Sequence, residues 1–261
     1  MTQSERREYL IHYLLREEIR FARQKVPADK SGQEELLRSL MNVRPPRPVS
    51  EDFLKIQDAY LKERNRERGI TDVADLTPVK SDSRLYIWQG DITTLKCDAI
   101  VNAGNSQMLG CFSPMHDCID NFIHTYAGVQ LRLKMYEIMK RQGHEEETGK
   151  AKITSAYNLP SKYILHTVGP IIQSKVSKKD ENLLASCYRE CLKLAADTGV
   201  ESVAFCCLST GLFRFPRQRA TKIAIGTVKQ YLIEDSRIKK VIFNVFKDED
   251  LRIYNRFLEE K

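Results

Sequence analysis

The sequence has no long apolar run. None of its 261 residues lies in a stretch that approaches the roughly 20 apolar residues of a membrane-spanning helix. The N-terminal MTQSERREYL lacks the apolar core of a signal peptide, and no internal repeat or low-complexity segment is present. These absences predict a cytoplasmic protein without a membrane partner. The length suits one sizeable globular domain with an appendage, or two small domains.

The sequence also lacks a recognised nucleic-acid-binding motif, although its formal net charge is +7. The basic residues are concentrated in the first third, in RREYL, REEIRFARQK and LKERNRERG, where acidic residues are mixed with them and aromatic residues are not interleaved. This pattern is typical of a solvated helical face. We therefore expect no nucleic-acid partner, while a basic surface would still favour an anionic ligand.

Seven cysteines in a cytoplasmic chain argue against a disulfide framework and for core packing, metal binding or reactivity. Four of them lie in an apolar run or share a helix face, as expected for small core residues: Cys187, Cys191, Cys206 and Cys207. The role of Cys97 is open. Cys111 and Cys118 remain, and both lie in the short stretch GCFSPMHDCIDNFIH.

Residues 1–80 are predicted to form a helical N-terminal extension. Apolar residues recur at helical spacing in YLIHYLLREEI, EELLRSLMNV and SEDFLKIQDAYLKERNRE, and Ser50 is positioned to cap the third helix. Three such helices would hardly build a stable core alone, so we expect them to lie against the main domain. They could pack on that domain, shield the ligand or recognise a partner protein.

Residues 81–261 are predicted to form an α/β domain, because short β-branched and aromatic runs alternate with helical patterns. The predicted strands cover 84–90, 97–104, 151–157, 162–168, 203–209 and 239–246. The predicted helices cover 118–142, 180–199, 216–235 and 248–260. Small, polar, turn-forming residues follow several strands, in VNAGN, HTVGP and LSTGLF. A ligand of such a sheet binds at the carboxyl ends of the strands, and these turns suit a phosphate.

Four ordered motifs in this region are similar to those of a known family. GDITTLKCDAIVNAGNSQML (90–109), DNFIHTYAG (120–128), YILHTVGP (163–170) and LSTGLFRFP (208–216) resemble the macrodomain family, over roughly residues 84–260. Members bind ADP-ribose, and some hydrolyse it from proteins. The resemblance implies a three-layer α/β/α fold with a mixed, mostly parallel central sheet.

The resemblance also implies roles for individual residues. Asp91 would accept a hydrogen bond from the adenine amino group, beside the Ile92 backbone. Asn102 and Asn105 match an asparagine motif of the family, in which Asn105 would hydrogen-bond the distal ribose. A second loop would surround the diphosphate with backbone N–H groups and place the aromatic ring of its fifth residue on the distal ribose: Ser209, Thr210, Gly211, Leu212 and Phe213.

Two departures from the family pattern are visible. Arg214 stands where the family usually has glycine, and it could pair with phosphate or guard the mouth of the loop. The glycine-rich first phosphate loop is replaced by CFSPMHDCID. This replacement resembles the zinc-containing subgroup of bacterial macrodomains, which are described as ADP-ribosyl hydrolases. Asp120 then falls where hydrolytic macrodomains place a catalytic aspartate.

The spacing Cys111-x4-His116-x-Cys118 offers two thiolates and one imidazole, which zinc prefers. No fourth cysteine or histidine follows at zinc-finger spacing, so we expect one Zn²⁺ per chain with one open position. A zinc that only shapes the loop, or no metal at all, are the alternatives. Asp117 is a rival to Asp120 in handling water, and we expect His124 to be structural.

These observations predict a zinc-dependent protein mono-ADP-ribosyl hydrolase with ADP-ribose and mono-ADP-ribosylated protein as partners. Asn105 and Asp120 are its predicted catalytic residues. A non-catalytic ADP-ribose reader and a hydrolase of free ADP-ribose derivatives are the alternatives. A reader would need the same pocket, but it would have no use for a three-ligand metal with an open position.

Overall fold

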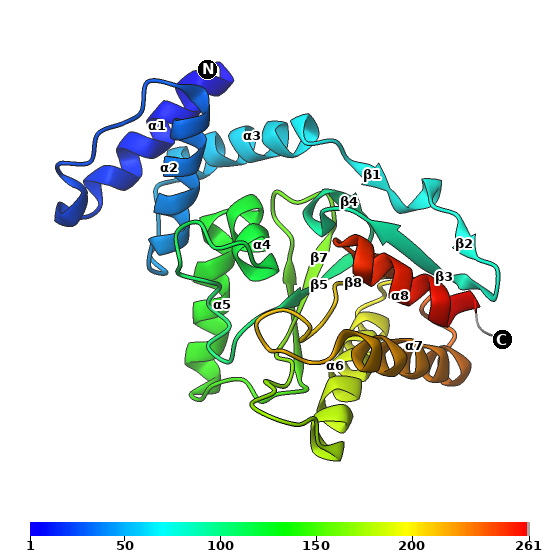
Figure 1. The fold of residues 1–261 in the computed structure, drawn as a ribbon. Coiled ribbons are helices and arrows are strands. Elements are labelled where there is room, and N and C mark those ends of the chain that lie inside the picture. Colours follow the sequence, from blue (N-terminus) through cyan, green and yellow to red (C-terminus); the bar gives the residue numbers. More distant parts are fainter. Residues whose placement is uncertain (260–261) are drawn as a thin grey trace.

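The structure, a computed structural model, describes residues 1–259 and has a seven-stranded central sheet (Figure 1). The strand order is β2-β3-β9-β8-β5-β7-β6. The edge strands β2 and β6 are antiparallel to their neighbours, and the five inner strands are parallel. The bounds are β2 Pro78–Val79, β3 Asp82–Gln89, β5 Ala99–Ala103, β6 Ala151–Ser155, β7 Tyr163–Thr167, β8 Ser202–Phe205 and β9 Lys240–Val245. The predicted mixed, mostly parallel sheet is confirmed.

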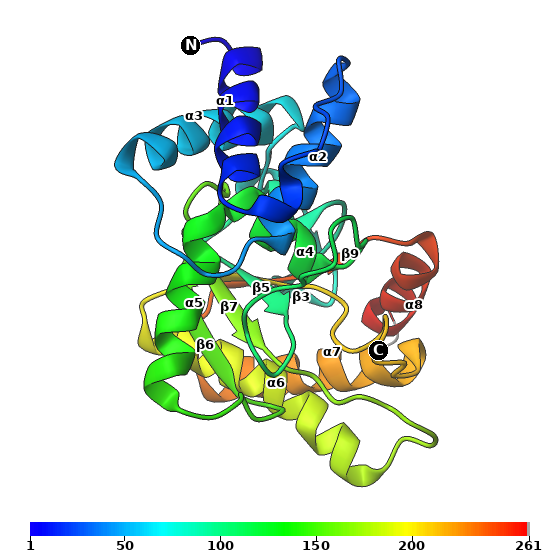
Figure 2. The same ribbon diagram turned by 90° about the vertical axis from the view of Figure 1, so that its left-hand side faces the viewer.

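Helices cover both faces of the sheet, as Figures 1 and 2 show, so the predicted three layers are also confirmed. One layer holds α4 and α5, and the other holds α6, α7 and α8, which contact one another in sequence order. The bounds are α4 Ile119–Ala127, α5 Val129–Gln142, α6 Lys178–Asp197, α7 Arg217–Glu234 and α8 Asp248–Glu259. The last residue of the predicted helix 248–260 lies outside the described residues.

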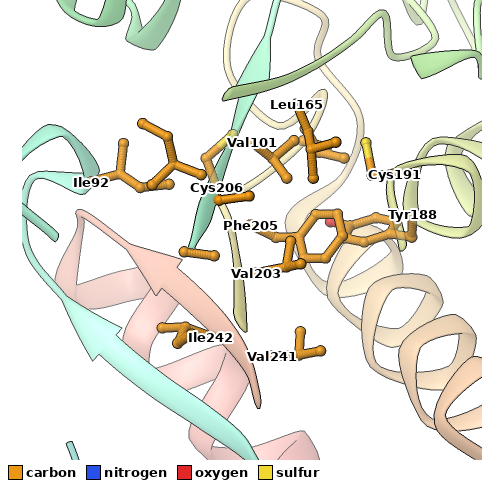
Figure 3. Close-up of a cluster of buried hydrophobic side chains, with 14 of the residues drawn as sticks. Ile92, Val101, Leu165, Tyr188, Cys191, Val203, Phe205, Cys206, Val241 and Ile242 are labelled. Carbon is orange, nitrogen blue, oxygen red and sulfur yellow. The ribbon is translucent and has the colours of Figure 1, made fainter. Parts of the chain in front are cut away.

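The core lies between the sheet and these helix layers. In Figure 3, Tyr188 and Cys191 of α6 face Phe205 of β8 and Leu165 of β7, and the Tyr188 and Phe205 ring centroids are 4.8 Å apart. All seven cysteines are free thiols. The predicted core role is confirmed for Cys187, Cys191 and Cys206, which are buried, whereas Cys207 is half-buried. Cys97 is also buried.

The prediction of one helix over 118–142 is wrong, because the chain breaks at Gly128. Its φ of 103° and ψ of 169° end α4 and start α5 in a region that is open almost only to glycine. A side chain here would also meet Gln57 of the N-terminal extension, since a Cβ would lie 2.7 Å from Gln57 Nε2. The backbone of Val129 instead donates to Gln57 Oε1.

The N-terminal extension forms three helices, α1 Gln3–Arg16, α2 Lys30–Val43 and α3 Glu51–Glu67 (Figure 2). Helices α2 and α3 contact α4, and α1 packs on α2 and α3. As predicted, the Ser50 hydroxyl caps α3 by accepting from Phe53 N. These helices bury a small apolar cluster that includes Val129 of α5, so the cluster is shared with the main domain. The extension therefore packs against the main domain through this cluster.

After α3 the chain first contributes to a separate two-stranded sheet, and it enters the central sheet only at β2. β1 (Thr71–Asp72) pairs with β4 (Leu95–Lys96), and β2 pairs with β3. The predicted division at residue 80 remains a prediction, and this strand pairing favours a boundary close to residue 70. Among residues 1–259, no helix combines the length and the low polarity that crossing a bilayer requires.

The break at Gly128 predicts a stability effect. Gly128→Ala should lower the free energy of unfolding by about 1–3 kcal/mol, because alanine is strained at this φ and ψ. Gly226→Ala is the control, since Gly226 lies inside α7 and an added methyl group would meet no atom within 4 Å. That change should stabilise by roughly 0.5–1 kcal/mol. Urea unfolding measures both, and equal effects would contradict the role assigned to Gly128.

Candidate functional site

The polar residues predicted from the sequence meet at the carboxyl ends of the inner strands. Asp91 follows β3, Asn105 follows β5, and the segment 208–214 follows β8. A long loop then leads from β5 over residues 104–118 to the start of α4 (Figure 1). Since these strands are parallel and belong to one sheet, their ends form one edge of that sheet, where ligands of such folds bind.

The loop brings the predicted metal ligands together. One possible ligand atom from each of Cys111, His116 and Cys118 lies within 4.8 Å of the others, the only such group found among residues 1–259. Cys111 Sγ is 3.5 Å from His116 Nδ1. Cys118 is also the N-cap of α4, where its Sγ accepts from Asn121 N at 3.4 Å. Burial and the neighbouring Cys111 raise the pKa of the Cys118 thiol to about 12.

Asp120 and Asn102 form a buried polar pair behind this loop. Asn102 Nδ2 donates to Asp120 Oδ1 at 2.8 Å and to His166 Nδ1 at 3.2 Å. Burial raises the pKa of Asp120 to about 6, while the hydrogen bond from Asn102 opposes that rise. Asn102 is 1% exposed, so the structure places it under the site rather than at its surface. It holds Asp120 in place.

His124 lies beside Asp120 in the same buried layer. Its Nε2 is 3.6 Å from Asp120 Oδ1, and within residues 1–259 neither ring nitrogen has a hydrogen-bond partner. Burial holds the pKa of His124 well below its usual value, so the ring is neutral. Gly110, at φ 81°, packs directly on this ring, since a Cβ there would come within 2.7 Å of it. This packing favours a structural role for His124.

Asn105 is half-buried at the end of β5, next to the loop. Its Nδ2 donates to Gly110 O at 3.3 Å, and its Oδ1 accepts from Gln107 N at 3.0 Å. These contacts fix the turn that starts the loop. Asp117 differs from Asp120, because 88% of its side chain is exposed and it pairs with Arg38 at 3.8 Å.

The segment 208–214 forms the predicted second loop. Ser209 has φ 62° and Arg214 has φ 58°. Arg214 therefore adopts the left-handed backbone that explains why glycine is usual at this position. Leu212 is 71% exposed, and in the described part of the chain the N–H groups of Gly211, Leu212 and Phe213 form no hydrogen bond. Three consecutive free N–H groups suit an anion.

Asp91 is already engaged by the protein. Its Oδ1 accepts from Thr93 N at 2.9 Å, and its Oδ2 accepts from Arg68, which follows α3. The Arg68 guanidinium carbon lies 3.5 Å from the Tyr126 ring centroid. Ile92 is buried and belongs to the main hydrophobic core. The prediction of a solvated face for LKERNRERG is wrong at Arg68, whose side chain is 14% exposed.

Two residues that lie near Asp91 at this sheet edge were not predicted from the sequence. Arg68 belongs to a charge run that is typical of a solvated face, and only the folded chain brings it to Asp91. Phe246 was expected to end a strand, but it follows β9 and is 72% exposed. Because Gly90 N donates to Val245 O, Phe246 lies next to Asp91 at the sheet edge. An aromatic residue that ends the last strand was the available signal.

The chain is similar to a known family and to proteins of two bacteria. The model of the Macro domain family matches residues 101–224. The chain is 56% identical to a protein-ADP-ribose hydrolase of Treponema medium, over 99% of this chain and all of that protein. It is 54% identical to one of Staphylococcus aureus (strain MSSA476), over 95% of this chain and 93% of that protein.

The chain is also similar to a solved macrodomain structure. The Trypanosoma brucei macrodomain in complex with ADP-ribose superposes with a TM-score of 0.66 at 28% identity, and the match covers 85% of this chain and 94% of that one. The chain belongs to the Macro domain family.

The buried contact of His166 predicts a pH effect on stability. Burial lowers the pKa of His166 from 6.5 to about 3, and the ring bonds Asn102 and Thr154 Oγ1. Between pH 6.5 and about 3 the unfolded chain therefore binds up to one more proton than the folded chain. The free energy of unfolding falls as the pH falls through this range. Its slope approaches about 1.4 kcal/mol per pH unit.

Urea unfolding of the metal-free protein between about pH 4 and 7 checks this slope. His166→Gln should have a shallower pH dependence than wild type. His144→Gln, at an exposed histidine, should retain the wild-type slope. Parallel slopes for wild type and His166→Gln would rule out the assigned role.

Proposed function

We propose that this chain is a zinc-dependent hydrolase that removes ADP-ribose from mono-ADP-ribosylated protein. The observation that carries the proposal is the Cys111, His116 and Cys118 group at the edge where a macrodomain ligand binds. The hydrolase names of the two relatives, which align over nearly the whole chain, support the reaction class. The seven free thiols are consistent with a cytoplasmic enzyme.

The three side chains fit a zinc ion. Their ligand atoms converge within 4.8 Å, and two thiolates with one imidazole leave a fourth position open. In the described chain no other cysteine or histidine joins the group, which favours a site that contacts substrate over a closed structural site. When bound, the zinc would supply Lewis-acid chemistry beside the distal ribose. We propose one zinc per chain.

The substrate would lie along the sheet edge. The exposed Phe246 ring would stack on adenine, with Asp91 accepting from the adenine amino group and the Ile92 backbone beside it. The free N–H groups of the second loop would hold the diphosphate, with Ser209, Thr210 and Arg214 around it. Phe213 would contact the distal ribose. These contacts would use remote binding energy to orient C1 of that ribose.

The reaction would add water to C1 of the distal ribose and break the bond from C1 to the protein side chain. The leaving side-chain atom would take a proton, and the products would be ADP-ribose and the unmodified side chain. Asn105 would position the ribose at the start of the loop. Asp120, fixed by Asn102, would position the water or accept its proton. We prefer Asp120 to the solvent-exposed Asp117.

A metal test separates the hydrolase from a reader. Cys118→Ala should lose the zinc, which is about one per chain in wild type, and its release of ADP-ribose from modified protein should fall at least about 100-fold. ADP-ribose binding should persist. Cys97→Ala, which removes a buried thiol outside the group, should retain both zinc and turnover. Turnover that survives the loss of zinc would refute zinc dependence.

The substrate panel decides between the alternatives. Zinc and tight ADP-ribose binding without release from any modified protein would favour the reader. Turnover only of ADP-ribose 1''-phosphate or O-acetyl-ADP-ribose would favour an enzyme of free metabolites.

The adenine position gives a separate prediction. Phe246→Ala should weaken ADP-ribose binding by roughly 10-fold, because stacking of a base on an aromatic ring contributes about 1–3 kcal/mol. Ile233→Ala is the matched control, since Ile233 is 76% exposed on α7. Calorimetric titration measures both affinities, and zinc content should not change. Equal affinities for the two variants would exclude stacking on Phe246.

A further inference from the structure

Helix α2 of the N-terminal extension lies directly against the metal-binding loop, 111–118. Arg38 of α2 donates to the backbone carbonyl of His116 at 2.9 Å. The same guanidinium donates twice to Asn121 Oδ1, at 2.9 and 3.1 Å, and lies 4.2 Å from the Phe122 ring centroid. Only 14% of the Arg38 side chain is exposed. The Arg38 side chain therefore holds the backbone of His116, a proposed metal ligand. It also holds the side chain of Asn121 at the start of α4.

Asn121 connects these contacts to a second ligand. Its backbone N–H donates to Cys118 Sγ, and its Nδ2 donates to Ser113 O at 2.7 Å. Asn42, one turn after Arg38 on α2, donates to Asn121 Oδ1 at 3.1 Å and to Thr125 Oγ1 at 2.8 Å. Asn121 is fully buried, so its amide has a single orientation set by these partners. Helix α2 thus reaches Cys118 through one intermediate residue.

Arg132 of α5 ties the loop to the end of α2 from the other side. Its Nε donates to Leu109 O at 2.7 Å and its NH2 group to Cys111 O at 3.3 Å. Its NH1 group donates to Asn42 O and Arg44 O, each at 2.6 Å, where α2 ends. The carbonyls at a helix C-terminus carry partial negative charge, which suits a buried guanidinium. Cys111, at the start of the loop, is therefore linked to α2 through Arg132, and His116, near its end, is linked to α2 through Arg38.

We propose that the N-terminal extension positions the metal site, with Arg38 as the positioning residue that sets the place of His116 and, through Asn121, of Cys118. The inference rests on the proposed zinc site. Partners that orient metal ligands raise metal affinity because the ligands are held in place before the metal binds. The loop has lost the glycines of its family, and α2 supplies the constraint that fixes its new conformation.

Arg38→Met tests this role, because methionine keeps the apolar packing on Phe122 and removes the donors. Zinc affinity, measured by competition with a chromophoric chelator, should fall roughly 10- to 100-fold. Arg38→Lys should recover little, because one ammonium group cannot replace the fork that bonds His116 O and Asn121 Oδ1 together.

Arg64→Met is the matched control. Arg64 of α3 is 26% exposed and pairs with Glu34 and Glu67 inside the extension, without a contact to the loop. It should bind zinc like wild type, and urea unfolding of the metal-free proteins corrects for any general weakening of the extension.

The outcomes separate this inference from the proposed function. Equal zinc affinity for Arg38→Met and Arg64→Met would overturn the positioning role and leave the hydrolase untouched. A wild-type protein that binds no zinc would overturn both the positioning role and the zinc dependence. A selective loss of zinc affinity in Arg38→Met would support the positioning role even if wild type released no ADP-ribose.

Discussion

The candidate site depends on the hydrogen bonds of the buried Arg132 guanidinium. It joins three segments that are distant in sequence: α5, the loop that carries the proposed metal ligands, and the end of α2. Burial lowers the pKa of Arg132 to about 10, so the side chain remains charged at neutral pH. A buried charge of this kind is stable only with its acceptors in place. The loop and the extension are therefore coupled by the cost of leaving this cation unpaired.

This coupling gives the N-terminal extension a defined structural role. A phosphate loop rich in glycine owes its shape to the backbone freedom of glycine. In this chain the segment CFSPMHDCID is proposed to take the place of that loop, and it is held by contacts with Arg38, Asn121 and Arg132. At the other end of the site, Arg68 after α3 contacts Asp91. The extension thus contacts both the proposed metal site and the proposed adenine site.

The sequence was informative where the signal is local. Short β-branched and aromatic runs predicted the six main strands. Three possible ligand residues within eight positions predicted the metal group, because residues so close in sequence can share one loop. The break at Gly128 was missed, since a single glycine is tolerated inside a helical pattern. Arg38 was missed for a different reason: its partner His116 lies 78 positions away, and such an arginine resembles a solvated one until the chain folds.

We propose that one metal ion lies between Cys111, His116 and Cys118, beside the distal ribose. Anomalous diffraction at the zinc absorption edge, from crystals grown with ADP-ribose, tests it most directly. We expect one zinc peak among these three side chains, with the distal ribose next to it and adenine between Asp91 and Phe246. ADP-ribose bound in this orientation, with no anomalous peak in the loop, would contradict the claim.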